Sequence, residues 1–233
     1  MVELEKAGLP GEKNRLLAGL PEAEYLRILP QLEPAALRFK QVLFDPDQPI
    51  EHVYFVRAGV GSVIATVNGA DVIEAGLVGN EGFIGLPVLF GAESTPNRVI
   101  VQVEGEAWRV SASVFRRLVD ESPLFRGACL RYAQYFNVQV TQSVACNRIH
   151  EVEERCARWL LMTVDRAGGT FDTTHEFLAL MLGVRRPGVT VTMGKLQGEG
   201  LIRYSRGHVA VLDRAGLERV SCACYGLTRA ALA

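Results

Sequence analysis

The stretch THEFLALMLGVRRPGVTVTMGKLQGEGLIRYSRGHVAVLD, residues 174–213, predicts two helices joined by a tight turn and followed by a two-stranded wing. Gly183 occupies the turn, and Ala179 falls where the two helices must approach closely. The second helix is expected to begin near Pro187, because the proline ring pre-sets φ for the first turn of a helix. Apolar side chains recur at helical spacing on the inner faces of the two helices: Leu178, Leu182, Val184, Val189, Met193 and Leu196.

The outward face of the second helix is basic near its start and carries small or hydroxyl-bearing side chains beyond. Arginine donates paired hydrogen bonds to guanine or phosphate, threonine bonds to several bases, and a methyl group can touch the thymine methyl. The pattern therefore predicts a DNA-reading unit, with an ordinary helical hairpin as the alternative. The expected DNA contacts are Arg185, Arg186, Thr190, Val191, Lys195, Arg203 and Arg206.

Composition and charge agree with a soluble globular protein. The 233 residues suffice for one large or two medium domains, and 48% hydrophobic and 22% charged residues are typical of globular chains. The net charge of −1 conceals an asymmetry: residues 1–147 hold 13 basic and 17 acidic side chains, whereas residues 148–233 hold 12 and 9. The positive excess thus lies in the half that contains the expected DNA-reading unit.

Targeting signals are not expected. The first residues, MVELEKAGLPGEKNR, lack a basic segment followed by an apolar core, and no apolar run approaches the roughly 18 to 20 residues that span a bilayer. The odd, scattered set of five cysteines differs from a secreted disulfide framework. A reducing cytoplasm and no membrane association are therefore predicted.

The first half of the chain changes from helical to strand periodicity. Residues 1–38 are expected to form short helices joined by loops. From Phe39 onward, β-branched residues alternate or cluster between turn signals, which favours a sandwich or small barrel of short strands. The turn signals are Asp45-Pro46-Asp47, Ala58-Gly59, Asn68-Gly69 and Glu104-Gly105.

A long helix is predicted over residues 123–147, followed by another over residues 151–167. One apolar line along the long helix, through Cys129, Tyr132 and Phe136, is expected to cover the strand domain. The other line would meet a second copy of the helix in a two-fold dimer, since a single recognition helix usually acts as one of a pair. A helix packed only on its own domain is the alternative. The expected dimer positions are Leu130, Ala133, Asn137, Val140 and Val144.

The order of these elements resembles the Crp/Fnr family of bacterial transcription regulators. The resemblance rests most firmly on HVYFVRAGVGSVIATV and EGFIGLPVLFG in the first half and on EFLALMLGVRRPGVTVTMGKLQGEGLI in the second. It implies an α+β fold: a cyclic-nucleotide-binding-like β-roll in residues 1–122, a long dimerisation helix in residues 123–147, and a winged helix-turn-helix in residues 148–233. It further implies a non-enzymatic homodimer that binds double-stranded DNA at an inverted repeat and contacts RNA polymerase.

The effector site departs from the family pattern. Where nucleotide-binding members carry a glutamate that holds the ribose, this chain has Leu86 in the turn Gly85-Leu86-Pro87, and leucine cannot accept that hydrogen bond. Arg98 lacks the small hydroxyl-bearing neighbour that follows the phosphate-binding arginine, and Val140-Thr141 retains one of two base-contacting hydroxyls. Cyclic AMP is therefore not expected to bind. The same five residues, Gly85, Leu86, Arg98, Val140 and Thr141, remain candidates for a pocket whose effector is unknown.

The remaining family features also differ. An N-terminal iron–sulfur cluster is not expected, because the first cysteine is Cys129, and His52 is interpreted as structural rather than as a haem ligand. Pro187 and Val191 stand where many members have a base-reading glutamate and a second arginine, so the operator is expected to differ. Val191 and Thr192 are expected to favour thymine methyls.

Three other functions are less well supported by the sequence. An enzyme is disfavoured, because the glycines of residues 79–85 lack nucleotide-binding spacing. Cys222 and Cys224 supply half of a zinc site or a redox switch with Cys156; the preferred interpretation is no metal, with small apolar side chains on one terminal helix. The third is a module that binds an effector or a protein without reading DNA.

Overall fold

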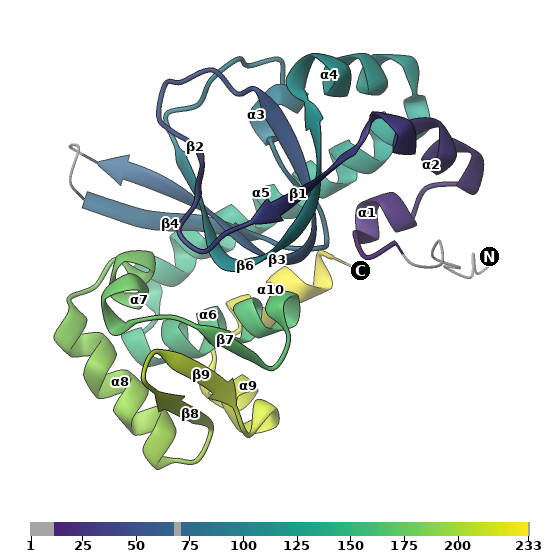
Figure 1. The fold of residues 1–233 in the computed structure, drawn as a ribbon. Helices are drawn as coiled ribbons and strands as arrows, with labels where there is room; N and C mark the ends of the chain where they lie inside the picture. The colour runs from purple at the N-terminus through teal and green to yellow at the C-terminus, as the bar shows by residue number, and fades with distance from the viewer. Residues whose placement is uncertain (1–11, 68–70, 233) are drawn as a thin grey trace.

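A β-roll and a winged domain, joined by a long helix, make up the protein (Figure 1). The computed structural model describes residues 12–67 and 71–232. The predicted turn at Asn68-Gly69 lies outside these ranges. The predicted absence of a signal segment at the N-terminus rests largely on residues outside them as well. Within these ranges, no helix is both long and apolar enough to cross a membrane.

The β-roll is a six-stranded antiparallel sheet with the strand order β1-β6-β3-β4, in which β2 also pairs with β6 and β5 with β3. Two long strands, β3 and β6, bend through several register shifts, which lets one sheet curl into a roll. Gly105 is required at one of these bends, because a Cβ atom there would lie 2.1 Å from the backbone oxygen of Ala58. The strands are β1 (Glu33–Leu37), β2 (Val42–Phe44), β3 (His52–Val67), β4 (Asp71–Val78), β5 (Phe83–Ile84) and β6 (Arg98–Ser111).

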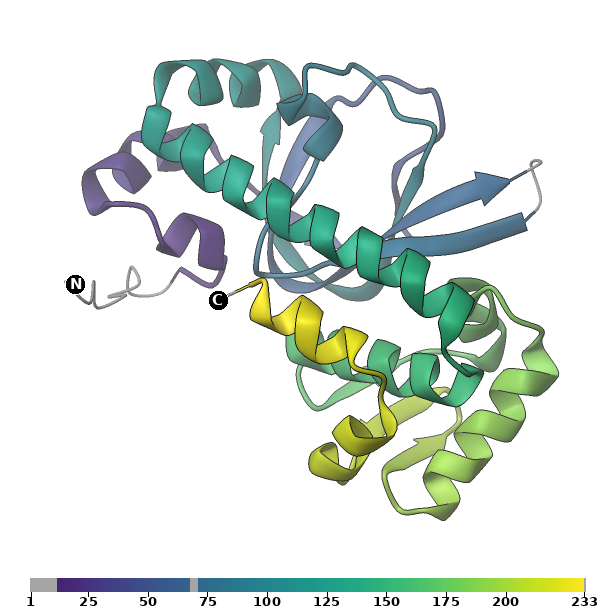
Figure 2. The same cartoon turned by 180° about the vertical axis from the view of Figure 1, so that it is seen from behind.

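Helices close the roll and connect it to the second domain. The strand β1 begins at Glu33, inside the segment predicted to form short helices joined by loops, because residues 33–37 pair along β6. The long helix α5 crosses one face of the roll (Figure 2), and its buried Gln139 bonds to both the N–H and the C=O of Leu77. The helices are α1 (Arg15–Ala18), α2 (Glu22–Ile28), the 3₁₀ helix η1 (Leu29–Gln31), α3 (Leu86–Leu89), α4 (Ala112–Glu121) and α5 (Pro123–Ile149).

The core of the roll is aromatic. Phe55, Phe83, Phe115 and Phe125 are fully buried, and their ring centroids lie 5.3 to 6.2 Å apart. Each ring comes from a different element, namely β3, β5, α4 and α5. The cluster therefore fastens the start of the long helix to the sheet, and this contact fixes the direction in which α5 leaves the roll.

The winged domain contains three strands rather than the predicted two. The short strand β7 pairs with β9, so the order is β7-β9-β8. The strand is too short to show an alternating pattern in the sequence. Packing holds it in place, because its Phe171 is 4% exposed and lies against Trp159. The elements are α6 (Val152–Ala167), β7 (Thr170–Asp172), α7 (His175–Leu182), α8 (Arg186–Gly198), β8 (Ile202–Ser205), β9 (His208–Val211), α9 (Arg214–Val220) and α10 (Cys224–Ala230).

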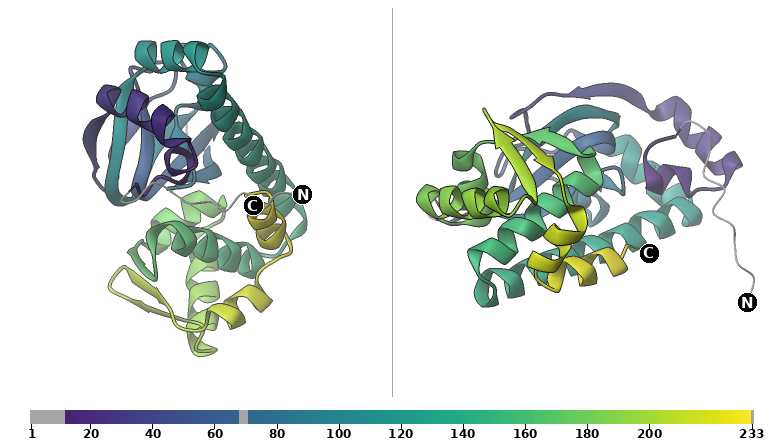
Figure 3. Two further views of the ribbon diagram at one scale, coloured as in Figure 1. Left: turned by 90° about the vertical axis from the view of Figure 1, so that its right-hand side faces the viewer. Right: turned by 90° about the horizontal axis from the view of Figure 1, so that it is seen from below.

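The C-terminal segment forms two helices, so the prediction of a single terminal helix is wrong. The chain leaves α9 at Ser221, where the backbone becomes extended (φ −68°, ψ 152°). The following helix, α10, turns back and packs against α5 (Figure 3). This reversal brings α10 alongside the long helix that leads into the winged domain.

The β-roll and the winged domain touch through buried polar contacts. Arg166 of α6 forms an ion pair with Glu81 of the roll at 2.8 Å, and the Trp159 Nε1 donates to the Glu74 Oε1 at 3.1 Å. The amide of Gln102 donates to Thr163 at 3.0 Å. Buried polar groups need specific partners, so these bonds select one orientation of the two domains.

Glu74 makes this contact sensitive to pH. Its Oε2 is buried without a hydrogen-bond partner, and burial raises the pKa of the carboxyl from 4.5 to about 7. Because the folded state holds the proton more tightly, the stability contributed by protonation is complete at low pH and is lost as pH rises through about 7. We expect Glu74→Gln to be more stable than the wild type at pH about 8. Urea unfolding of both proteins at several pH values checks this, and parallel pH profiles would contradict it.

Candidate nucleic-acid interface and effector pocket

The helix-turn-helix forms through local sequence signals. The Thr174 hydroxyl caps α7 by accepting from the Phe177 N–H at 3.1 Å, and Gly183 ends the helix in the left-handed region (φ 60°). Arg185 is the N-cap of α8, and Pro187 lies in its first turn. The predicted turn residue and the predicted helix start are thus both confirmed.

The inner faces of α7 and α8 meet as the periodicity predicts. Leu178, Val189, Met193 and Leu196 are at most 1% exposed, and Val184 is partly buried. Thr192 also faces inward and is 8% exposed. The expectation that Thr192 favours thymine methyls is therefore wrong, because its side chain does not reach the outer face of the helix.

The predicted DNA contacts are all exposed, and they lie at the start and along α8 or in the β8–β9 hairpin; these seven residues are called the exposed basic surface. Val191 is 73% exposed at the middle of α8. Arg186 lies 3.9 Å from the Glu176 carboxylate, and the Lys195 ammonium bonds to Glu153 at 2.7 Å. Three guanidiniums on this surface form no ion pair with any carboxylate of the described chain: those of Arg185, Arg203 and Arg206.

His175 joins the recognition helix to the wing, a role that sequence reasoning missed. Its Nδ1 lies 3.0 Å from the Thr190 hydroxyl, and its ring stacks on Tyr204 of β8 with centroids 4.5 Å apart. Burial, together with the nearby Arg186 charge, lowers the pKa of His175. The imidazole therefore holds α8 and β8 together without adding charge at neutral pH. No sequence signal marks it, because a histidine at a helix start has many roles.

A cavity of about 540 Å³ lies between the β-roll and α5. Of the predicted pocket residues, Gly85, Leu86 and Val140 line it. Within the described chain its lining contains no charged side chain, and its polar members are Thr95, Asn97, Gln134 and Asn137. Most of the wall is aliphatic or aromatic, so the cavity suits an apolar ligand better than a phosphate.

Two predicted pocket residues lie outside the cavity. Arg98 points away from it and forms an ion pair with Asp45 at 2.8 Å, where its side chain is half exposed. The Thr141 hydroxyl donates to the Asn137 carbonyl at 2.9 Å on the exposed side of α5. Arg98, the only arginine among the predicted pocket residues, therefore does not line the cavity that would hold a ligand.

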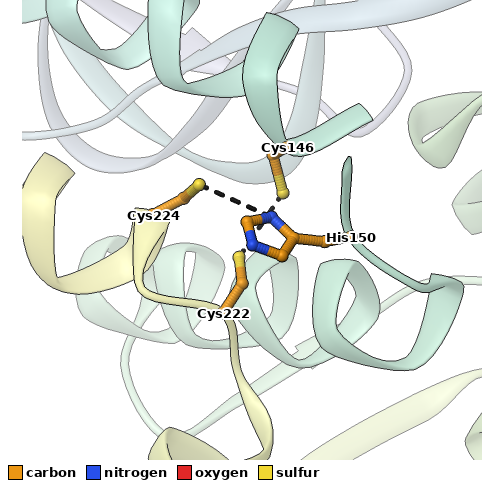
Figure 4. A group of neighbouring side chains, drawn as sticks. All are labelled: Cys146, His150, Cys222 and Cys224. Carbon is orange, nitrogen blue, oxygen red and sulfur yellow. Dashed lines mark hydrogen bonds between the residues drawn. The ribbon is translucent and has the colours of Figure 1, made fainter. Parts of the chain in front are cut away.

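The cysteines do not pair as the sequence suggests. Cys156 is buried beside the Met193 sulfur, at 3.8 Å, and lies apart from the C-terminal cysteines. Cys222 and Cys224 instead meet Cys146 and His150 at the end of α5 (Figure 4). The signal that could have indicated this group is the four-residue spacing of Cys146 and His150, which places both on one side of a helix.

Comparisons with known proteins agree with this architecture. The model of the cyclic nucleotide-binding domain matches residues 36–122, and that of the Crp-like helix-turn-helix domain matches residues 154–220. Together the two matches cover more than half of the chain. No curated protein matches it by sequence.

Three solved structures share the fold at low identity. FixK2 from Bradyrhizobium japonicum superposes with a TM-score of 0.69 at 13% identity, covering 82% of this chain and 98% of its own. The c-di-GMP responsive global regulator CLP from Xanthomonas campestris has a TM-score of 0.67 at 18% identity, covering 82% and 99%. The CRP/FNR-family transcriptional regulator TTHA1359 from Thermus thermophilus has a TM-score of 0.64 at 21% identity, covering 81% and 98%.

A cyclic-nucleotide-binding-type roll followed by a Crp-like helix-turn-helix defines a two-domain transcription regulator with a DNA-binding domain. The two domains occur here in that order, joined by α5, and the exposed basic surface lies on the second. The chain belongs to the Crp/Fnr family of transcription regulators.

Proposed function

We propose that this regulator binds DNA as a homodimer at an inverted-repeat operator, and that its β-roll has lost cyclic-nucleotide binding. The observation that carries the DNA-reading half of the proposal is the exposed basic surface of α8 and the β8–β9 hairpin. Arg185, Arg203 and Arg206 leave their charges unpaired within the described chain, which suits contact with phosphates or guanine. The match to a Crp-like helix-turn-helix favours this function over a module that does not read DNA.

The outer side of α5 supports the dimer. Leu130 and Val144, two of the predicted dimer positions, are 49% and 68% exposed, although both are large apolar side chains; a third predicted position, Ala133, is instead buried at 8% exposure. They share a helix with Cys129 and Tyr132, which are buried against the roll. A second copy of α5 would cover the exposed line and place two recognition helices on one DNA duplex.

The apolar cavity supports the loss of cyclic-nucleotide binding. A cyclic nucleotide brings a phosphate charge and a ribose, and both require polar partners when they are buried. Leu86 offers no acceptor to the ribose, and Arg98 is engaged with Asp45 outside the cavity. An apolar or weakly polar effector is the class of ligand that fits this lining.

The proposal is tested by selecting duplex DNA from a random pool with the purified full-length protein at moderate salt. We expect enrichment of an inverted repeat whose half-sites lie about one helical turn apart. Affinity for the selected duplex should fall steeply as salt rises, because bound phosphates release counterions. Adding cyclic AMP or cyclic GMP should leave the affinity unchanged.

The outcomes separate the parts of the proposal. Enrichment of a single, unrepeated half-site would contradict the dimer, and failure to enrich any sequence would contradict DNA reading. A change in affinity with either nucleotide would contradict the loss of nucleotide binding. Comparing freshly purified with dialysed protein then reports whether a bound effector changes DNA affinity.

A further inference from the structure

Four metal-binding side chains from distant parts of the chain converge at the end of α5. The donor atoms of Cys146, His150, Cys222 and Cys224 all lie within 4.8 Å of one another. The Cys146 and Cys222 sulfurs are 3.4 Å apart, and the Cys224 sulfur is 3.7 Å from the His150 Nδ1. Figure 4 shows the four side chains pointing toward a common centre. We propose that this group, which is separate from the proposed DNA and effector sites, binds one zinc ion.

The donor set and its spacing both match zinc. Structural zinc sites are four-coordinate and tetrahedral, and three cysteines with one histidine are a common ligand set. Zn–S and Zn–N bonds of about 2.3 and 2.0 Å imply distances of about 3.5 to 3.8 Å between donors. The two observed distances, 3.4 and 3.7 Å, lie at or close to this range. No donor pair is farther apart than 4.8 Å, so movements of up to about 1 Å between donors complete the tetrahedron.

The ligands are held by the fold before any ion is considered. Cys146 lies in the last turns of α5, and His150 follows that helix as its C-cap. Cys222 lies in the short link after α9, and Cys224 is the first residue of α10. The three cysteines are at most 4% exposed, so the thiols are buried together in a space that water scarcely reaches. Preorganised ligands on separate elements are what a structural metal site requires.

Two arginines, the buried Arg158 and the half-buried Arg155, supply the charge that such a site needs. Three thiolates and a neutral imidazole around Zn²⁺ carry a net charge of −1. Arg155 and Arg158 border the same small cavity as Cys146. Neither forms an ion pair with a carboxylate of the described chain, and the Nε atom of each is buried without a partner. Buried guanidiniums are costly without a negative group nearby, and a zinc–thiolate centre provides one.

Two other uses of these cysteines fit the geometry less well. A disulfide between Cys146 and Cys222 would need its sulfurs at about 2.05 Å, and it would leave Cys224 and His150 without a role. An iron–sulfur cluster distributes its cysteine ligands over several iron atoms. Four donors within 4.8 Å of one another surround the volume of a single ion.

The position of the site indicates what the metal does. Zinc would tie α10 and the link after α9 to the last turn of α5, beside the turn that leads into α6. That turn is the direct connection between the long helix and the winged domain. A bound ion would therefore fix the direction of the winged domain relative to α5, and its loss would release the end of α10.

The test uses the full-length protein, expressed with zinc in the medium, purified under reducing conditions and desalted. Elemental analysis should find about one zinc per protomer in the wild type and less than about a tenth of that in Cys222→Ala and in His150→Ala. Cys156→Ala and Cys129→Ala remove the same sulfur from buried cysteines outside the group, so they should retain the metal. Circular dichroism of each variant reports whether it is folded.

Cobalt provides a readout that does not depend on how the protein was expressed. Wild-type protein stripped with a chelator and reloaded with Co²⁺ should show the visible absorption and the thiolate charge-transfer bands of a tetrahedral site, and Cys222→Ala should not. Wild-type protein without zinc and without these bands would overturn the proposal. Zinc that persists in both ligand variants would also overturn it, as would iron together with labile sulfide. A metal-free protein that lacks two titratable thiols would indicate a disulfide instead and would overturn the proposal too.

Discussion

Glu81→Leu should lower the free energy of unfolding by about 3 to 5 kcal/mol, the cost of leaving one partner of a buried ion pair alone. The side chains of Arg166 and Glu81 are 6% and 2% exposed. Burial by itself lowers the pKa of Arg166, but the Glu81 carboxylate outweighs that effect and raises it. Without Glu81, the guanidinium would keep bonds to the Met162 carbonyl and the Tyr135 hydroxyl, both at 2.7 Å, but no counter-charge.

The control for this prediction is the double variant Glu81→Leu/Arg166→Met. Replacing both charged groups by apolar side chains removes the uncompensated charge, so the double variant should be more stable than Glu81→Leu alone. Urea unfolding followed by circular dichroism measures all three proteins. If the single variant unfolds at the wild-type midpoint, the ion pair does not hold the domains together.

Arg186→Ala should weaken binding to the selected operator by roughly 1 to 3 kcal/mol, or about 5- to 150-fold. The Arg186 side chain is 67% exposed, and its guanidinium is only loosely paired with Glu176. It stands at the first position of α8, the end of a recognition helix that reaches base edges or phosphates. Equilibrium binding by fluorescence anisotropy at fixed salt gives the affinity.

A matched control is Arg109→Ala, which removes an exposed arginine from the β-roll. Arg109 is 43% exposed and pairs with Glu33, so its loss changes the net charge equally while leaving the basic surface intact. Its affinity for DNA should be close to that of the wild type. Loss of discrimination at one base pair in Arg186→Ala would indicate a base contact, whereas a shallower salt dependence would indicate a phosphate contact. Equal affinities of Arg186→Ala and the wild type would remove Arg186 from the interface.

The helix-turn-helix was predictable in detail because its signals are local. Gly183 adopts the left-handed conformation that ends α7, and Pro187 lies in the first turn of α8, where its fixed φ is compatible with a helix. The inner residues were identified from helical spacing alone. Thr192 is the exception. It is polar and lies next to the apolar stripe of α8, so the sequence does not indicate whether its side chain is buried or exposed.

The β-roll was predictable as a class but not in its pairings. Alternation indicated strands, yet β1 and β7 depend on partners far along the chain. Glu33 pairs opposite Arg109, and Phe171 opposite Val209. Such short segments become strands through tertiary contact, which overrides weak local preference.

The sequence by itself determined the order of the elements, the family and the positions of the basic residues on α8, because each of these follows from spacing within one segment or from matching motifs. Only the tertiary structure decided which remote side chains meet. It turned Arg98 away from the cavity toward Asp45, paired Arg166 with Glu81, and brought Cys222 and Cys224 to Cys146 and His150. The physical reason is that contacts between distant segments depend on how α5, α6 and α10 pack together, and no spacing along the chain records that packing.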